Sequence, residues 1–188
     1  MKEIQLILHG ATGFTGRLAA EELNRNAPEG LRWAVSGRTS EKVNALAKKY
    51  RVPGIIADSL QASDMESLAK RSGVILSCAG PYSVFGTPLV QACVKHETHY
   101  ADLCGELPWI HEIIQQHHEA CVQKNITLIP SSGFDSVPTD LAVHALRKTL
   151  SQPCELYGFF KIKGGLNGGT LHSGLALAEK QTLPPPPP

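Results

Sequence analysis

The chain has 188 residues, and its 18 Lys and Arg against 17 Asp and Glu give a formal net charge of +1. This length accommodates one complete domain and part of a second, and 42% hydrophobic with 19% charged residues excludes a disordered chain. Because there is no surplus of cations for phosphate contacts, the charge balance argues against nucleic acid as a partner.

The sequence contains no targeting or anchoring signal that we can recognise. No segment approaches the roughly 18 apolar residues that a membrane-spanning helix requires, and Met1 is followed almost at once by a strand-like run. The five cysteines form no Cys-x-x-Cys pair, which favours free thiols in a reducing compartment. We therefore expect a cytoplasmic protein, with membrane or lipid-surface association of a full-length form left open.

Short apolar segments alternate with longer amphipathic segments over the first 150 residues. The short segments predict strands at residues 4–9, 32–36, 55–57, 74–78, 99–103 and 126–129. The longer segments predict helices at residues 14–26, 40–50, 65–71, 86–96, 107–124 and 139–150. Ser63 or Asp64 is the expected N-cap of the third helix. This alternation is typical of an α/β fold of Rossmann type, a doubly wound parallel sheet with helices on both faces.

The pattern changes after residue 150. Residues 154–163 predict one long strand, and an apolar helical pattern then continues to about Ala178. The chain ends in five prolines, which lack backbone donors and favour an extended conformation. We expect a dinucleotide-binding domain over residues 1–150, the incomplete start of a substrate or dimerisation domain over 151–183, and a proline tail over 184–188.

A glycine-rich segment separates the first predicted strand from the first predicted helix. Its residues are Gly10, Ala11, Thr12, Gly13, Phe14, Thr15 and Gly16. Gly10 permits a tight turn, Gly13 lets the backbone approach a pyrophosphate, and Gly16 lets the helix pack closely on the sheet. The helix N-terminus would present its free N–H groups to the phosphates. The segment predicts a dinucleotide site, and a purely structural glycine turn is the alternative.

The end of the second predicted strand discriminates between the two nicotinamide cofactors. NAD-binding proteins carry an Asp or Glu there, which holds the ribose 2′-hydroxyl. This chain has Ser36, Gly37 and Arg38 instead. A guanidinium forms charge-assisted bonds to a 2′-phosphate, which a carboxylate would repel. We expect NADP as the cofactor, with NAD and a solvated loop role for Arg38 as the alternatives.

Further cofactor-binding residues are expected after the third and fourth strands. Asp58 is placed to contact the adenine amino group, and the segment that follows the fourth strand should line the crevice with its backbone. That segment consists of Cys78, Ala79, Gly80 and Pro81.

Taken together, these motifs resemble the saccharopine dehydrogenase-like oxidoreductases. The similarity is to the branch that contains the bacterial trans-acting enoyl reductases and the saccharopine dehydrogenase-like proteins of eukaryotes, and it covers roughly residues 4–175. The segments that carry it are residues 10–16, 36–38, 78–82 with Gly86, 99–106 and 132–140. The segments Ala-Gly-Pro-Tyr and Gly-Phe-Asp-Ser-Val-Pro-Thr-Asp are its most specific parts.

The resemblance implies a Rossmann domain followed by a mixed α/β domain, in proteins about twice as long as this chain. It implies hydride transfer from NADP(H) to a C=C or C=N acceptor in a small-molecule or lipid-linked substrate, and it leaves a homodimer open. The missing part of the second domain would supply most of the substrate pocket. A non-catalytic NADP-binding scaffold or a lipid-associated interaction protein is the alternative function. An NmrA-like sensor is a weaker alternative, against which the Gly-Phe-Asp-Ser-Val-Pro segment argues.

Tyr82 is the expected catalytic candidate. It follows the Gly-Pro turn after the fourth strand, where a phenol could orient the substrate or donate a proton. The alternative is that Tyr82 packs in the interior with its hydroxyl bonded locally.

Residues after the fifth and sixth strands are expected to line the substrate site. They are Asp102, Cys104, Phe134, Asp135 and Ser136. The neighbouring Glu106 could act as a general acid–base group, but the stronger expectation is that it caps the helix that begins at residue 107.

Two other patterns are rejected. Tyr157 and Lys161 have the spacing of a short-chain dehydrogenase pair, but that spacing requires a helix and these residues predict a strand. The His96/His99 and His117/His118 pairs lack a third ligand at zinc-like spacing, so no metal is expected.

Overall fold

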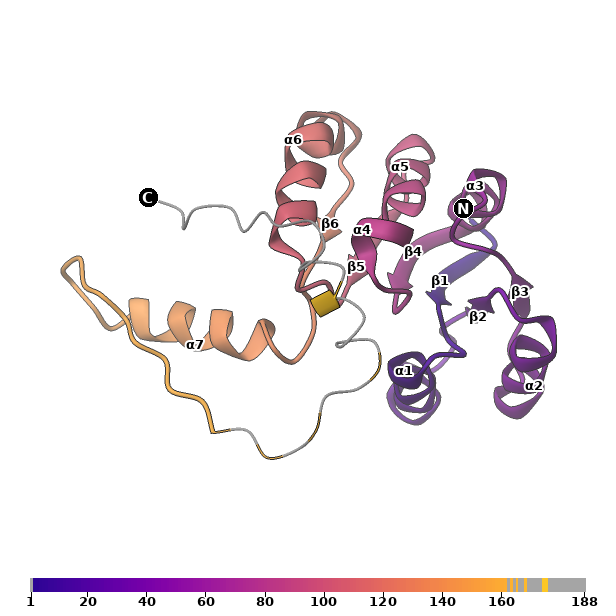
Figure 1. Ribbon diagram of the computed structural model, residues 1–188, viewed down its shortest axis with the longest axis horizontal. Helices are drawn as coiled ribbons and strands as arrows, with labels where there is room; N and C mark the ends of the chain where they lie inside the picture. The colour runs from indigo at the N-terminus through magenta and orange to yellow at the C-terminus, as the bar shows by residue number, and fades with distance from the viewer. Residues whose placement is uncertain (1, 162, 164, 166–167, 169–173, 176–188) are drawn as a thin grey trace.

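A six-stranded parallel sheet forms the centre of the computed structural model (Figure 1). The structure describes residues 2–161, 163, 165, 168, 174 and 175. The strands are β1 (Ile4–His9), β2 (Trp33–Gly37), β3 (Gly54–Ile56), β4 (Ser72–Ser77), β5 (His99–Asp102) and β6 (Leu128–Ile129). Their order in the sheet is β3-β2-β1-β4-β5-β6, which is the order of a Rossmann fold and confirms the predicted fold class.

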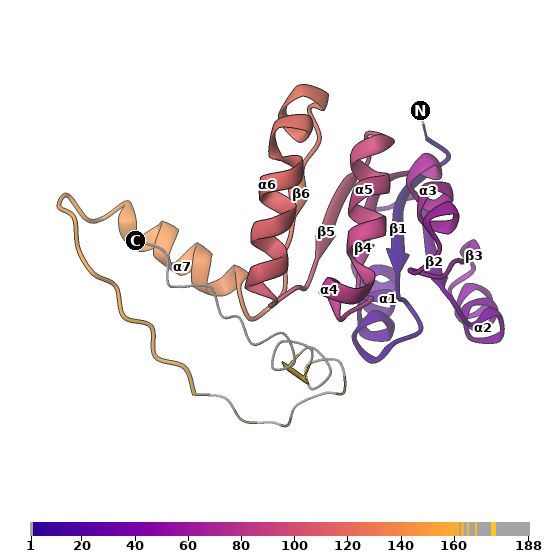
Figure 2. The same ribbon diagram turned by 45° about the horizontal axis from the view of Figure 1, so that its top comes forward.

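Helices cover both faces of this sheet. The helices of residues 14–147 are α1 (Phe14–Asn26), α2 (Ser40–Tyr50), α3 (Ala62–Arg71), α4 (Tyr82–Phe85), α5 (Thr87–Lys95), α6 (Leu107–Lys124) and α7 (Val137–Arg147), of which α7 does not lie on the sheet. Figures 1 and 2 show α1 and α2 on one face and α3, α5 and α6 on the other. Helices α1, α2 and α6 have the predicted bounds, and α4 lies in a stretch where no helix was predicted.

Strand β1 contributes to both hydrophobic layers because its side chains alternate between the two faces. Ile7 packs with Met65 and Leu89 beneath α3 and α5, whereas Leu8 packs with Val43 beneath α2. All of these side chains are fully or almost fully buried. Two cores therefore hold β1 between its neighbours, and its position fixes where the glycine segment emerges from the sheet.

Strand β1 lies in the middle of the sheet, between β2 and β4. β2 pairs with β1 on one side and β4 pairs with it on the opposite side, both in parallel register. Because α1, which follows β1, and α5, which follows β4, lie on opposite faces of the sheet, the connections separate here and form a crevice at the carboxyl edge. The residues that follow β1, β2, β3 and β4 meet at this edge.

Two local predictions are wrong. Helix α3 begins after Gln61, whose carbonyl oxygen accepts the first hydrogen bonds of the helix, and not after Ser63 or Asp64; the Asp64 carboxylate accepts a hydrogen bond from Asp58 N at 2.9 Å. The strand predicted for residues 154–163 is absent from their described positions, where Phe159 is 95% exposed. A strand needs a neighbour for its backbone groups, and the described part of the chain supplies none there. The predicted helix to Ala178 and the proline tail lie outside the described residues.

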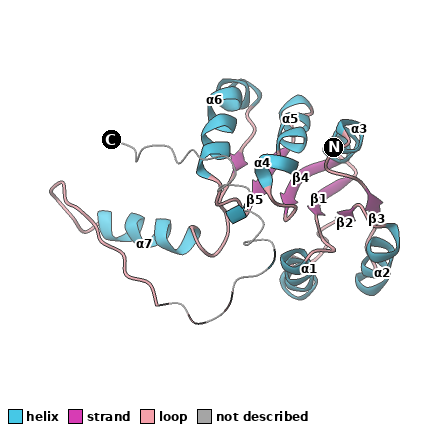
Figure 3. Ribbon diagram, viewed as in Figure 1, coloured by secondary structure: helices cyan, strands magenta, loops and turns pink. Residues whose placement is uncertain are grey.

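Helix α7 stands apart from the sheet (Figures 1 and 2). None of its residues is buried, and Leu141 is 59% exposed. Figure 3 shows the segment that directly follows α7, up to residue 161, as a loop. The sheet with its packed helices therefore ends at β6, and the predicted division of the chain near residue 150 stays a prediction.

Candidate nucleotide-binding site

A cavity of about 210 Å³ opens at the carboxyl edge of the sheet. Several residues predicted to bind the cofactor line it: Gly10, Gly13, Gly37, Arg38, Asp58, Cys78, Ala79 and Gly80. It is also lined by residues that were not predicted: His9, Ala57, Ser59 and Phe85. The sequence motifs of four separate strands thus meet in one cleft.

A second, larger cavity of about 410 Å³ lies between α6 and β6. Its lining is mainly aliphatic, with Ile113, Val122 and Leu128 as examples. Its lining shares no residue with the cavity at the glycine segment and includes no lysine or arginine that could bind a phosphate. The chemistry of a nucleotide therefore fits the smaller cavity better than the larger one.

The three glycines of the motif have different surroundings. A Cβ on Gly16 would lie 2.2 Å from the carbonyl oxygen of Gly10, and Gly10 itself has φ of +74°. Only glycine fits these two positions without moving the backbone. A Cβ on Gly13 would meet nothing closer than the Gly10 oxygen at 3.4 Å. Gly10 and Gly13 both line the cleft, but Gly10 also lies against the backbone of Cys78 and Ala79, and Gly16 makes the close approach of α1 to the sheet.

Gly13 is also the N-cap of α1 and supplies no side-chain hydrogen bond to the helix. The N–H groups of the first turn, which includes Phe14 and Thr15, remain available to an anion at the positive end of the helix dipole. The remaining predicted residues of the motif hold the loop: Ala11 is fully buried, and its N–H donates to the carbonyl oxygen of Ser36 at 3.0 Å. Thr12 packs its side chain near Gly37.

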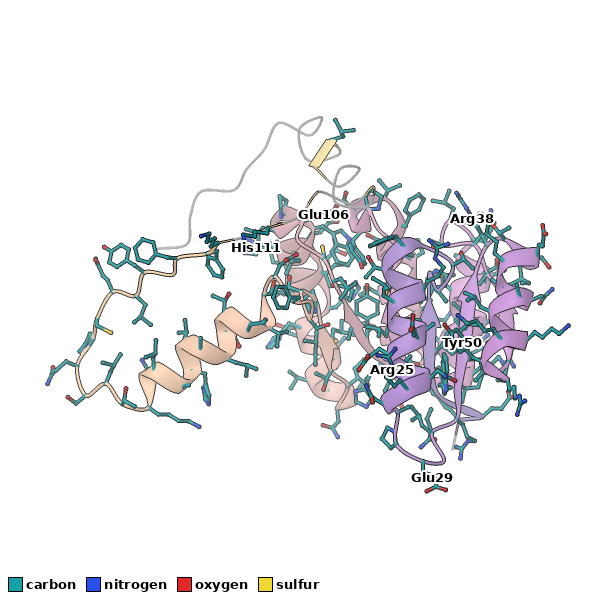
Figure 4. All side chains as sticks on the ribbon, turned by 90° about the horizontal axis from the view of Figure 1, so that it is seen from below. Arg25, Glu29, Arg38, Tyr50, Glu106 and His111 are labelled. Carbon is teal, nitrogen blue, oxygen red and sulfur yellow. The ribbon has the colours of Figure 1, made fainter. Side chains whose placement is uncertain are left out.

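Arg38 is the cation of the cleft. It follows β2, its side chain is exposed, and it has no hydrogen-bond or ion-pair partner among the described residues. Figure 4 shows Arg38 at the same edge of the domain as Glu106, with Glu29 at the opposite edge. The guanidinium is therefore free to bind an anionic group beside the glycine loop.

Asp58 begins the turn after β3 in the same cleft. Its Oδ1 accepts a hydrogen bond from Leu60 N at 3.0 Å, so one carboxylate oxygen shapes the turn that presents it. Cys78 lies across the cleft, and its N–H donates to the carbonyl oxygen of His9. Burial raises the pKa of the Cys78 thiol to about 11, so the side chain is a neutral part of the wall.

His9, which was not predicted, lies beneath the cleft with its side chain almost fully buried. Its Nδ1 lies 3.2 Å from the Ser36 hydroxyl and its Nε2 lies 2.8 Å from the Ser59 hydroxyl. Burial lowers the pKa of His9 to about 4, and the negative charge of Asp58 opposes this shift only partly. The ring is therefore neutral at ordinary pH. A polar residue at the end of an otherwise apolar strand was the signal in the sequence.

The structure favours the packing alternative for Tyr82 over a catalytic role. The phenol is buried, its hydroxyl donates to the carbonyl oxygen of Ser77 at 3.0 Å, and Leu103 N donates to that hydroxyl at 3.3 Å. Burial is the main cause of a strongly raised pKa. Its ring lies against Trp109, with the centroids 5.8 Å apart. Tyr82 thus fastens α4, which begins directly after Pro81, to α6.

Asp102 and Cys104 are buried and do not line this cleft, and their expected contact with substrate stays a prediction. The Asp102 carboxylate accepts hydrogen bonds from Tyr100 Oη, Cys104 N and Ser131 N at 2.7, 2.9 and 3.0 Å. Burial raises its pKa, although these three bonds act in the opposite direction. Burial also raises the pKa of the Cys104 thiol, to about 12. Both side chains hold loops together.

Glu106 is a cap, but of a different helix from the one expected. It occupies the N-cap position of α6, where its carbonyl oxygen accepts a hydrogen bond from Ile110 N at 3.1 Å. Its Oε1 and Oε2 instead accept hydrogen bonds from Tyr82 N and Ser83 N at 2.8 and 2.9 Å. The buried carboxylate therefore neutralises the N-terminus of α4 and ties it to the loop before α6.

The last predicted lining residues lie away from this cleft. Phe134 is 89% exposed, Asp135 is exposed, and Ser136 is the N-cap of α7 without a side-chain bond to it. None of them contributes to the described cavity. Their expected contact with substrate stays a prediction.

Comparison with known proteins matches this geometry. The profile of the family described as "Saccharopine dehydrogenase NADP binding domain" matches residues 6–129. The chain is 33% identical over 190 residues to a saccharopine dehydrogenase-like oxidoreductase of Rattus norvegicus, which covers 92% of the chain and 44% of that relative. It is 42% identical over 150 residues to a trans-acting enoyl reductase of Mycobacterium leprae, with 77% and 36% covered.

Solved structures share the fold at low identity. Apo saccharopine dehydrogenase (L-Glu forming) from Saccharomyces cerevisiae superposes with a TM-score of 0.64 at 20% identity, over 77% of the chain and 31% of that protein. The triphenylmethane reductase of Citrobacter sp. complexed with NADP(H) gives 0.51 at 19% identity, over 66% and 48%. The chain spans less than half the length of the curated relatives that it matches.

Proposed function

Because the chain belongs to the saccharopine dehydrogenase family through its NADP-binding domain, we propose that it is the cofactor-binding part of an NADP-dependent oxidoreductase. The observation that carries this proposal is the Arg38 guanidinium directly after β2, which has no partner among the described residues and lies in the same cleft as the N-terminus of α1, where no side chain caps the helix. A cation and a helix N-terminus in one cleft suit a nucleotide that carries a pyrophosphate and a 2′-phosphate.

Each part of the nucleotide has a group in the cleft to receive it. The pyrophosphate would lie on Gly13 and the first turn of α1, the 2′-phosphate on Arg38, and the adenine ring near Asp58. The backbone of Ala79 and Gly80 would hold the nicotinamide end on the other side of β1. When bound, NADP(H) supplies the hydride, and these residues bind and orient it.

The acceptor that we propose is a C=C or C=N bond in a small-molecule or lipid-linked substrate. The names of the enoyl reductase and saccharopine dehydrogenase relatives support these two bond types. A cytoplasmic location and a homodimer belong to the same proposal. No helix in the described part of the chain is long and apolar enough to cross a membrane.

One observation favours a second function, that of a non-catalytic NADP-binding scaffold. Tyr82 and Asp102 are both held by hydrogen bonds inside the domain. NADPH fluorescence with enoyl and imine acceptors separates the two functions: an oxidoreductase consumes NADPH, whereas a scaffold binds NADPH and leaves it unchanged.

Replacement of the cleft cation tests the cofactor assignment. We expect Arg38→Ala to weaken NADP(H) binding by roughly tenfold or more and to leave NAD(H) binding within about twofold, because only NADP(H) carries the 2′-phosphate. Isothermal titration of both cofactors measures this. Arg25→Ala, in the last turn of α1 away from the cleft, is the matched control. Equal affinities of the wild-type chain for the two cofactors would contradict the proposal.

A further inference from the structure

His9 connects two strands beneath the cleft. Its ring takes one serine hydroxyl on each nitrogen, that of Ser36 in β2 and that of Ser59 in the turn after β3. The His9 side chain is only 2% exposed, so water has little access to the ring. Breaking either contact would leave a buried polar nitrogen unsatisfied, and such a loss is costly. The two hydrogen bonds therefore hold the ring in one orientation.

Ser59 differs from Ser36 in its access to the cleft. Ser36 is fully buried, whereas Ser59 is half-buried and lines the cavity beside Asp58. A hydroxyl has one donor and two acceptor positions, and the His9 contact uses one of them. The other positions of the Ser59 hydroxyl remain for a ligand in the cavity that this residue lines. Because His9 is neutral, one of its ring nitrogens donates and the other accepts, and the tautomer sets whether the Ser59 hydroxyl donates to Nε2 or accepts from it.

We propose that Ser59 contacts the adenine ring of the bound nucleotide and that His9 is the positioning residue that sets the direction of the Ser59 hydroxyl. This inference rests on the proposed function. The order of groups along the sheet edge supports it: the glycine loop follows β1, Arg38 follows β2, and Ser59 follows β3. A nucleotide whose phosphates lie on the glycine loop and on Arg38 has its base beside Ser59.

Two substitutions at His9 separate its two hydrogen bonds. His9→Gln places an amide near the position of Nε2 and can keep the contact with Ser59. His9→Asn places its amide near the position of Nδ1, so that it keeps the contact with Ser36 and loses the one with Ser59. Both replacements are neutral, polar and smaller than histidine. Ser59→Ala removes the hydroxyl itself, and Ser63→Ala on the exposed surface of α3 is its matched control.

The measurement is the affinity of the 188-residue chain for adenosine 2′,5′-bisphosphate and for 5′-AMP, by isothermal titration. We expect Ser59→Ala and His9→Asn each to weaken both ligands by roughly three- to tenfold, the effect of one hydrogen bond. His9→Gln and Ser63→Ala should stay within about twofold. Arg38→Ala differs, because it should weaken only the ligand with the 2′-phosphate. The double variant His9→Asn/Ser59→Ala should lose no more than either single variant, because both remove the same contact.

Two results would overturn the inference. The first is that Ser59→Ala binds both ligands as the wild-type chain does. The second is that the losses of His9→Asn and Ser59→Ala multiply in the double variant, since His9 would then act on binding without Ser59. If the wild-type chain bound neither ligand nor NADP(H), the proposed function itself would fail, so the two failures are distinguishable.

Discussion

At the scale of single residues, the glycines of the first loop have two different roles, close packing and ligand approach. Gly16 has no room for a side chain because the backbone of Gly10 and Ala11 lies against it. Gly13 has ordinary space but faces the cleft. Packing and ligand approach are therefore required at different positions of one motif, although the sequence shows the same residue type at each.

Alanine substitution should separate these two requirements. Gly16→Ala should lower the free energy of unfolding by about 2 kcal/mol or more, because backbone atoms must move to admit the Cβ. Gly13→Ala should change stability by less than about 1 kcal/mol but weaken NADP(H) binding. Chemical denaturation and ligand titration measure the two quantities. Gly105→Ala, where a Cβ meets nothing within 4 Å, is the control. Equal effects of Gly13→Ala and Gly16→Ala on stability would contradict this assignment.

The buried His9 ring should make folding depend on pH. The unfolded chain takes up a proton on this residue near pH 6.5, whereas the folded chain does so only near pH 4. The contribution of neutral His9 to stability is therefore complete above pH 6.5 and is lost as the pH falls toward 4, by up to about 3 kcal/mol. Urea denaturation of the wild-type chain and of His9→Gln at pH 7 and pH 5 measures it. The wild-type chain should lose more stability than the variant, and parallel losses would show that His9 is not the group responsible.

At the scale of elements, the short helix α4 depends on a residue far from it in sequence. Four residues form too few internal hydrogen bonds to hold a helix, so its stability must come from outside. Glu106 binds its first two N–H groups, and the Tyr82 ring packs on Trp109 of α6. The loop that bears the predicted nicotinamide contacts is thereby held in place from the opposite side.

Removal of this cap should destabilise the domain. Glu106→Ala leaves the N–H groups of Tyr82 and Ser83 without their acceptors, at a cost of about 2–4 kcal/mol. Glu106→Gln keeps one amide oxygen and should lose less. Thermal and urea denaturation measure both, with Glu112→Ala on the exposed face of α6 as the control. A loss with Glu106→Ala no greater than that of the control would contradict the capping role.

At the scale of the whole molecule, we expect the protection of backbone amides from hydrogen exchange to differ strongly between elements. The strand β1 lies between two hydrophobic layers, whereas α7 buries none of its residues. In the 188-residue chain, hydrogen–deuterium exchange should be slow in β1 and β4 and fast throughout α7. Exchange in α7 as slow as in α5 would show that its apolar face is covered, for example by a second copy of the chain.

Local signals account for the elements that were predicted correctly. The apolar run of residues 4–9 and the amphipathic pattern of residues 107–124 lie within one element each, and the structure has both at the predicted bounds. The strand predicted for residues 154–163 has a comparable pattern but no partner in the described structure. A strand is stable only through its neighbours, and no local pattern contains them.

The nucleotide-binding role of the cleft could be predicted from the sequence because its glycines and Arg38 meet local needs. A tight turn and a helix N-terminus require glycine, and an anion requires a cation. Their positions alone therefore indicated a Rossmann domain and a phosphate-bearing nucleotide. The roles of His9, Ser59, Tyr82, Asp102 and Glu106 could not be read in this way. Each of these side chains bonds to a residue that is distant in the sequence. Only the folded arrangement determines whether a polar group faces a ligand or is hydrogen-bonded inside the protein.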